Sequence, residues 1–183
     1  MTYWYSSPCR RSRLEFSGLF ALLLLFGCGG GVSAPKGADG SPAEILLIFD
    51  ANVDEKASEE TQAEHHELAK WMEKDIVNRF EDGGYTVTTG ADPSEFEPGK
   101  GKFLITVKMV EYTPASATSR EEAGFGAGTT VIDTYTELFT DNHTIPRYRL
   151  KKGEVSARDW SYCAEQVTSS VVKDLSKTMN EMY

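Results

Sequence analysis

Two adjacent histidines come nearest to a zinc-ligand sequence in this chain. His65-His66-Glu67 begins like the helix of a zinc protease, but Lys70 stands where the second ligand is required. Neighbouring helix residues point about 100° apart, so the two histidines make a poor pair for one metal ion. We therefore predict a solvated helix surface and no metal site. His143 falls in a predicted turn, without an evident catalytic partner.

Carboxylates near residue 50 begin like a calcium-binding loop. Asp50, Asn52 and Asp54 have its alternate spacing, but Glu55 stands where that loop needs glycine, and a strand precedes it instead of a helix. The sequence therefore argues against bound calcium. Dispersed carboxylates leave one enzymatic alternative open, a periplasmic hydrolase that uses Asp50, Asp54 and Asp133.

A glycine motif consists of Gly124, Phe125, Gly126 and Gly128. A glycine loop that binds a dinucleotide must open a helix, whereas the residues after Gly128 have the composition of a strand. We expect a tight connection that needs positive φ and close backbone approach, with Phe125 packed inward. A part in a functional surface stays open, and no cofactor is predicted.

The three cysteines have different expected fates. Cys9 belongs to a segment that is predicted to be removed, and Cys28 follows it directly. Cys163 adjoins the apolar stripe of the last predicted helix and has no base nearby in the sequence, which indicates a buried structural thiol rather than a nucleophile. No intramolecular disulfide is expected in the mature chain.

The first 27 residues have the order of a secretory signal. Arginines within 10–13 precede an apolar run over 14–26, and the small Gly27 precedes Cys28. The densest part of the run, 19–26, measures about 12 Å as a helix, far less than the ~30 Å of a hydrocarbon core. Cleavage between Gly27 and Cys28 is therefore predicted.

Leu25-Phe26-Gly27-Cys28 resembles the lipobox of bacterial lipoproteins, although Phe26 departs from the usual small or aliphatic residue. In that family the cysteine sulfur receives diacylglycerol, and the new amino terminus is acylated, as with palmitate. The resemblance implies a lipid anchor on Cys28 in the bacterial cell envelope, with the protein facing the periplasm. Gly29, in place of the aspartate that retains many such proteins in the inner membrane, favours the outer membrane.

Composition divides the remainder into a tether and one domain. Residues 28–42 are rich in glycine and proline and are expected to form a flexible tether with a reach of roughly 20 Å. Residues 43–183 suffice for a single domain. The formal charge is −9, and removal of residues 1–27, which carry +2, leaves −11. Such a domain should repel nucleic acid and anionic headgroups.

Hydrophobic periodicity predicts two amphipathic helices among five strands. Ser58 is the expected N-cap of the first helix, whose Leu68, Met72, Ile76 and Phe80 recur every four residues. The helices are expected at 58–81 and 157–182, and the strands at 44–50, 85–89, 102–112, 129–140 and 144–150.

The ends of these elements have their own signals. Ser156 and Asp159 resemble a capping box at the start of the second helix, and Pro146 favours an edge position for the last strand. The order β-α-β-β-β-β-α predicts an α+β fold, a mostly antiparallel sheet with both helices on one face.

Arg120, the glycine motif and the strand that ends near Asp141 together resemble domain-of-unknown-function family 4410 of bacterial lipoproteins. The resemblance covers the chain from the strand ending Phe49-Asp50 to the last helix, and it implies no established activity. The sequence therefore favours a non-enzymatic envelope lipoprotein that binds another protein or supports an envelope assembly.

Overall fold

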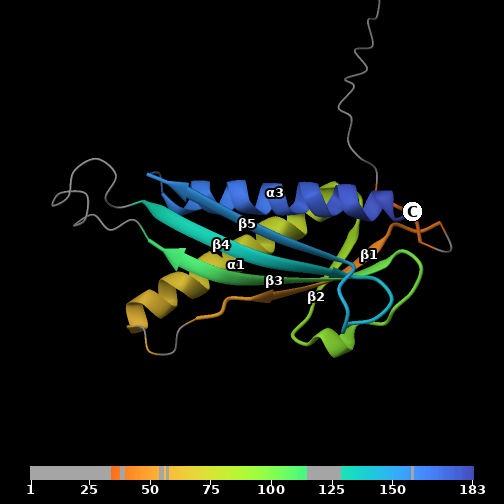
Figure 1. Cartoon of the computed structure of the whole chain (residues 1–183), viewed down its shortest axis with the longest axis horizontal. Helices are drawn as coiled ribbons and strands as arrows, with labels where there is room; N and C mark the ends of the chain where they lie inside the picture. Colours follow the sequence, from red (N-terminus) through yellow and green to blue (C-terminus); the bar gives the residue numbers. More distant parts are fainter. Residues whose placement is uncertain (1–33, 38–39, 54–55, 57, 115–128, 158) are drawn as a thin grey trace, which may run out of the picture. The chain divides into compact units, whose positions relative to one another are not determined.

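The structure is a computed structural model that describes residues 34–37, 40–53, 56, 58–114, 129–157 and 159–183. A 24-residue helix crosses behind the sheet in Figure 1, and a 22-residue helix runs beside it. Along the chain the elements are β1 (Glu44–Asp50), α1 (Glu59–Asp82), β2 (Thr86–Thr89), the short 3-10 helix η1 (Pro93–Glu95), β3 (Lys102–Thr113), β4 (Thr130–Phe139), β5 (Tyr148–Ser156) and α3 (Trp160–Glu181).

The five strands form one sheet in the order β2-β1-β3-β4-β5. The α+β fold class and the element order are as predicted from the sequence. The sheet is mixed: β1 pairs in parallel with β2 and β3, whereas β3, β4 and β5 pair in antiparallel. Two of the four pairings are thus parallel, because the chain returns along the sheet twice, through α1 between β1 and β2 and through the segment with η1 between β2 and β3.

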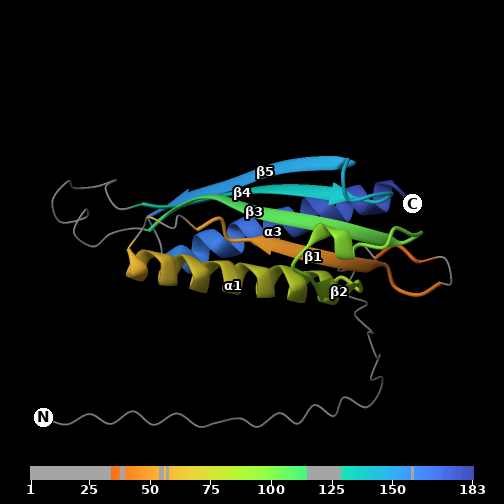
Figure 2. The same cartoon turned by 90° about the horizontal axis from the view of Figure 1, so that it is seen from below.

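Both helices lie on one side of the sheet, as Figure 2 shows, and they cover a single apolar core. The predicted stripe of α1 is confirmed, because Leu68, Met72, Ile76 and Phe80 are all at most 1% exposed. They pack with the stripe of α3 and with inward residues of the strands. The buried residues of α3 are Cys163, Ala164, Val167, Thr168, Val171, Val172, Leu175 and Met179.

The two helices begin at capping side chains. Ser58 caps α1 as predicted, since its Oγ accepts a hydrogen bond from the Thr61 backbone N–H at 3.2 Å. For α3 the predicted role of Ser156 is wrong. Ser156 still belongs to β5, where it pairs with Thr130, and Asp159 is the cap through its 3.0 Å bond from Tyr162.

The last strand is displaced from its predicted range of 144–150. The Asn142 side-chain oxygen accepts hydrogen bonds from the backbone N–H groups of Thr144 at 2.9 Å and Ile145 at 2.8 Å. This Asx turn and Pro146, which has no N–H, keep the chain out of the ladder until Tyr148. The edge position of β5 is confirmed.

The chain before β1 already makes backbone hydrogen bonds. Gly37 donates to Ser41 at 2.8 Å within the region predicted as a tether, and Ala43, the first residue of the predicted domain, donates to Pro35 of that region at 3.1 Å. No helix within the described ranges is long and apolar enough to cross a membrane. Gly27, Cys28 and the glycine motif at 124–128 lie outside the described residues.

Candidate functional site

The sheet has a second face that neither helix covers, visible from the front in Figure 1. Alternate residues of each strand point to it, opposite those that enter the core. We call this surface the uncovered face. On the four longer strands its residues include Glu44, Leu46, Ile48 and Asp50, then Lys102, Leu104, Thr106 and Lys108, then Asp133, Tyr135 and Glu137, and Arg149, Lys151 and Val155.

Ion pairs between neighbouring strands run across the uncovered face. Lys108 Nζ lies 3.6 Å from Asp50 Oδ2, and Lys151 Nζ lies 2.9 Å from Asp133 Oδ2. Arg149 bonds Glu137 at 3.0 Å, which raises the pKa of the guanidinium. Cross-strand pairs of opposite charge stabilise a sheet only slightly when exposed. Their main consequence is a polar surface whose charges are locally balanced.

The dispersed carboxylates of the hydrolase alternative do not meet. Asp50 lies on β1 and Asp133 lies on β4, with β3 between them. Each is paired with a lysine, and neither lines any of the three pockets at the edges and ends of this sheet. Asp54 lies outside the described residues. A general acid–base pair needs two groups that reach one substrate, so these two residues do not form one.

Gly153 on β5 leaves space for the carboxylate of Asp133. A Cβ built on Gly153 would overlap the carboxylate of Asp133, which faces it across the β4–β5 ladder. Asp133 therefore folds over the bare glycine backbone and reaches Lys151. The glycine is required by this close approach of a side chain, not by its own φ.

Apolar side chains reach solvent at one end of the sheet. Val155 on β5 is 61% exposed, and Val110 on β3 is 48% exposed. Val110 sits where the register of β3 against β4 shifts between Met109 and Glu111, which is a β-bulge. Bulges redirect side chains at sheet ends, and here the bulge coincides with a valine in solvent.

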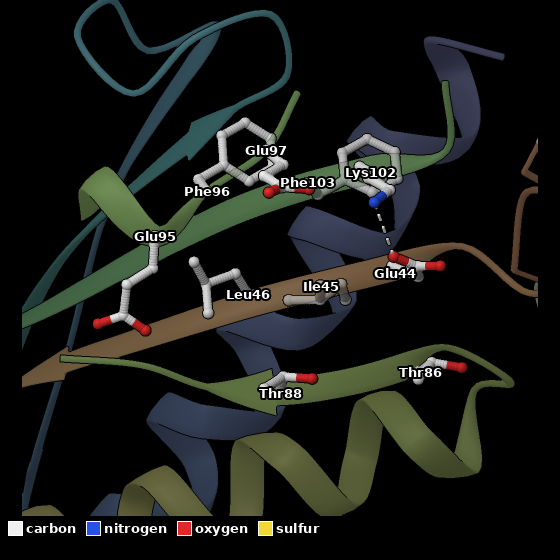
Figure 3. A pocket seen from close by; sticks show the side chains of 10 residues that line it. All are labelled: Glu44, Ile45, Leu46, Thr86, Thr88, Glu95, Phe96, Glu97, Lys102 and Phe103. Carbon is white, nitrogen blue, oxygen red and sulfur yellow. Dashed lines mark ion pairs between the residues drawn. The ribbon is translucent and has the colours of Figure 1, made fainter. Parts of the chain in front are cut away.

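A shallow pocket lies at the other end, under the segment that carries η1 (Figure 3). Its volume is about 240 Å³. Phe96 and Leu46 form its apolar wall, and the Lys102–Glu44 ion pair, at 3.4 Å, lies on its rim. Phe96 is only 6% exposed because it packs on Leu104 and Phe139 as a second small core. The pocket is therefore the margin of a structural cluster.

A third feature, which we call the acidic pocket, lies where the N-terminal ends of α1 and α3 meet the end of β3. Its volume is about 320 Å³. It is lined by Glu64 and Glu67 of α1, Tyr112 and Pro114 at the end of β3, Thr130 of β4, and Asp159 and Trp160 at the start of α3. No sequence pattern predicted this pocket, because its residues are brought together only by tertiary packing.

The prediction of a solvated histidine pair is wrong for His65. His66 is exposed, but the His65 ring packs on Tyr112 with centroids 5.3 Å apart. Its Nε2 is buried and has no hydrogen-bond partner among the described residues. Burial, and secondarily the charge of His66, lower the pKa of His65. No cluster of three or more metal ligands occurs in the part of the chain that the structure describes.

The remaining predicted positions have structural roles. Cys163 is fully buried with its Sγ 3.8 Å from the Thr130 carbonyl oxygen, and burial raises its thiol pKa, as expected for a structural thiol. Asp50 Oδ1 accepts the Asn52 N–H at 2.8 Å, and Asn52 has φ of 49°, so this segment is an Asx turn. His143 lies in the turn between β4 and β5.

No family model matches the chain, and no curated protein matches it. Solved structures with similar chain traces include a PelC variant dodecamer from Paraburkholderia phytofirmans, with TM-score 0.47 and 17% identity over 79% of this chain and 90% of that one. Another is described as a neuraminyllactose-binding hemagglutinin homologue from Helicobacter pylori, with TM-score 0.46 and 13% identity over 82% and 90%.

Lipoprotein GNA1162 from Neisseria meningitidis is also similar, with TM-score 0.41 and 14% identity over 74% of this chain and 99% of that one. At these identities and TM-scores the three structures assign no role to this chain. The resemblance to domain-of-unknown-function family 4410 stays a prediction, carried by a glycine motif outside the described residues.

Proposed function

We propose that this chain is a lipoprotein of the bacterial envelope, anchored through Cys28, whose domain binds another envelope protein without catalysing a reaction. The lipobox and the signal that precedes it support the anchor. The anchor fixes where the protein works and leaves the folded domain to make the contact. Gly29 favours an anchor in the outer membrane, with the domain facing the periplasm.

The uncovered face is the observation that carries the binding role. Four strands of seven or more residues present one side that neither α1 nor α3 covers, although the segment that carries η1 packs over part of it at Leu104 and Phe139. Its balanced ion pairs and the exposed Val110 and Val155 give it the mixed polar and apolar character of a non-obligate protein interface.

The anchor is tested by labelling cells with a radioactive fatty acid and comparing the native protein with Cys28→Ala. We expect label on the native protein, none on the variant, and release of the variant from the membrane fraction. Serine at the same position serves as a second variant, since it keeps the size of the side chain without the sulfur nucleophile. A native protein without label would refute the anchor.

The binding role is tested by placing a photo-crosslinking residue at Val155 in the native envelope. The matched control has it at Asn78, which is exposed on α1 on the opposite side of the molecule. We expect one reproducible protein adduct from position 155 and none from position 78. Equal adducts from both positions, or none from 155, would contradict the proposal whether or not the anchor is confirmed.

A further inference from the structure

The acidic pocket combines two features that together select a cation. Glu64 and Glu67 stand one helical turn apart on α1, and both are exposed. Neither carboxylate forms an ion pair within the described residues, whereas Asp50, Asp133 and Glu137 on the uncovered face all do. The pocket therefore holds two negative charges that pair with no cation in the part of the chain that the structure describes.

Aromatic rings provide the second feature. Tyr112 and Trp160 line the same cavity, and Trp160 is held edge-on against Trp71 with centroids 6.0 Å apart and an angle of 83°. Rings positioned by such contacts present fixed π surfaces, and a cation over a Trp or Tyr ring is attracted by its quadrupole. Aromatic walls beside carboxylates recur in sites for ammonium and guanidinium groups.

The electrostatics of neighbouring groups agree with this geometry. Burial, then Glu64 and Glu67, raise the pKa of the Tyr112 phenol, so the two glutamates act on the interior of the pocket. His65 supplies no competing positive charge at neutral pH, because burial lowers its pKa below the ordinary value. Asp159 already caps α3 by accepting from Tyr162 and Ser161.

We propose that the acidic pocket binds the alkylammonium or guanidinium group of a lysine or arginine side chain. The cation lies against the Tyr112 and Trp160 rings, and Glu64 and Glu67 neutralise it. This site lies at the end of the fold, apart from the ion pairs of the uncovered face. Binding of the cation there depends neither on the lipid anchor nor on the uncovered face. A free amine has the same cationic chemistry, and the test separates the two sources.

The experiment titrates the full chain in detergent with three ligands. They are a pentapeptide whose one charge is on a central lysine, the same peptide with norleucine at that position, and n-butylammonium. Binding is read by calorimetry and by tryptophan fluorescence. We expect the lysine peptide to bind at about millimolar concentration, as suits a single side chain, and the norleucine peptide not to bind. Tighter binding of the peptide than of n-butylammonium assigns a polypeptide ligand, and the reverse assigns a free amine.

Two double variants decide whether the pocket is responsible. Glu64→Gln with Glu67→Gln should weaken the lysine peptide about tenfold, the scale of two exposed ion pairs. Glu59→Gln with Glu60→Gln removes the same charge from exposed positions in the first turn of α1, outside the pocket, and should leave binding within twofold or so, because salt screens distant charges. Equal binding of the norleucine peptide, or unchanged affinity in the first variant, would overturn the proposal.

Discussion

The Thr168 hydroxyl lies 2.5 Å from Oδ2 of Asp75, and this contact joins α3 to α1 across 93 residues of sequence. The same carboxylate accepts from Arg79 Nε at 2.6 Å. Thr168 is fully buried, whereas the Asp75 side chain is 20% exposed. A polar link between the two helices thus lies at the border of their apolar stripes.

Thr168→Val removes this link while it keeps the side-chain shape. We expect the free energy of unfolding to fall by about 1–2 kcal/mol, since the lost bond ends on a partly exposed charged group. Thr136→Val is the matched control, because Thr136 is equally buried but its Oγ1 has no partner among the described residues. That change should be neutral or stabilising. Urea denaturation measures both, and an equal loss from the two variants would refute the role of the Thr168–Asp75 bond.

Gly153→Ala should destabilise the domain by about 1–3 kcal/mol, the range for an added methyl group in a filled space. The new Cβ would take the position of the Asp133 carboxylate and separate it from Lys151. Gly99→Ala is the control, since a Cβ there meets only the flexible Lys102 side chain, at 3.3 Å or more. Thermal unfolding of the two variants tests this prediction. A Gly153→Ala protein as stable as the native one would contradict it and show that the Asp133 side chain can adopt another conformation.

The elements were predictable from the sequence because their signals are local. The four-residue recurrence from Leu68 to Phe80 and the cap at Ser58 depend on neighbours along one helix, and both appear in the structure. The parallel pairing of β1 with β3 was not predictable in this way, since it depends on which side of β1 the later strand joins. Register between strands is set by tertiary packing.

The candidate sites show the same division. The structural thiol of Cys163 follows from its place in an apolar helix stripe, which is a local pattern. His65 was misjudged because its burial depends on Tyr112, 47 positions along the chain and on another element. The acidic pocket is assembled from two helices and two strands, so no residue spacing in the sequence predicts it.

Stability should fall in alkaline solution. Burial raises the pKa of Tyr85, and that of Tyr112, above the ordinary value near 10. Above that pH the unfolded chain releases protons that the folded protein still holds, so the free energy of unfolding decreases as pH rises through the folded pKa. Tyr85→Phe should reduce this loss relative to the native protein. Urea midpoints between about pH 9 and 11 measure it, and parallel curves for the two proteins would contradict the assignment.

In acid the sign is set by His65, whose pKa is lowered in the folded protein. As pH falls below about 6.5 the unfolded chain binds a proton that the folded ring resists, and stability is lost toward the folded pKa. His65→Phe keeps the ring on Tyr112, removes the buried Nε2 that lacks a described partner, and should be neutral or stabilising by about 1 kcal/mol at pH 7. It should also flatten the dependence of stability on pH between about 5 and 7.

His66→Gln is the control. It removes the neighbouring charge, so the pKa of His65, followed by NMR, should rise while the packing on Tyr112 is kept. If His65→Phe lost stability and retained the full acid dependence, the ring would not be buried as the structure places it.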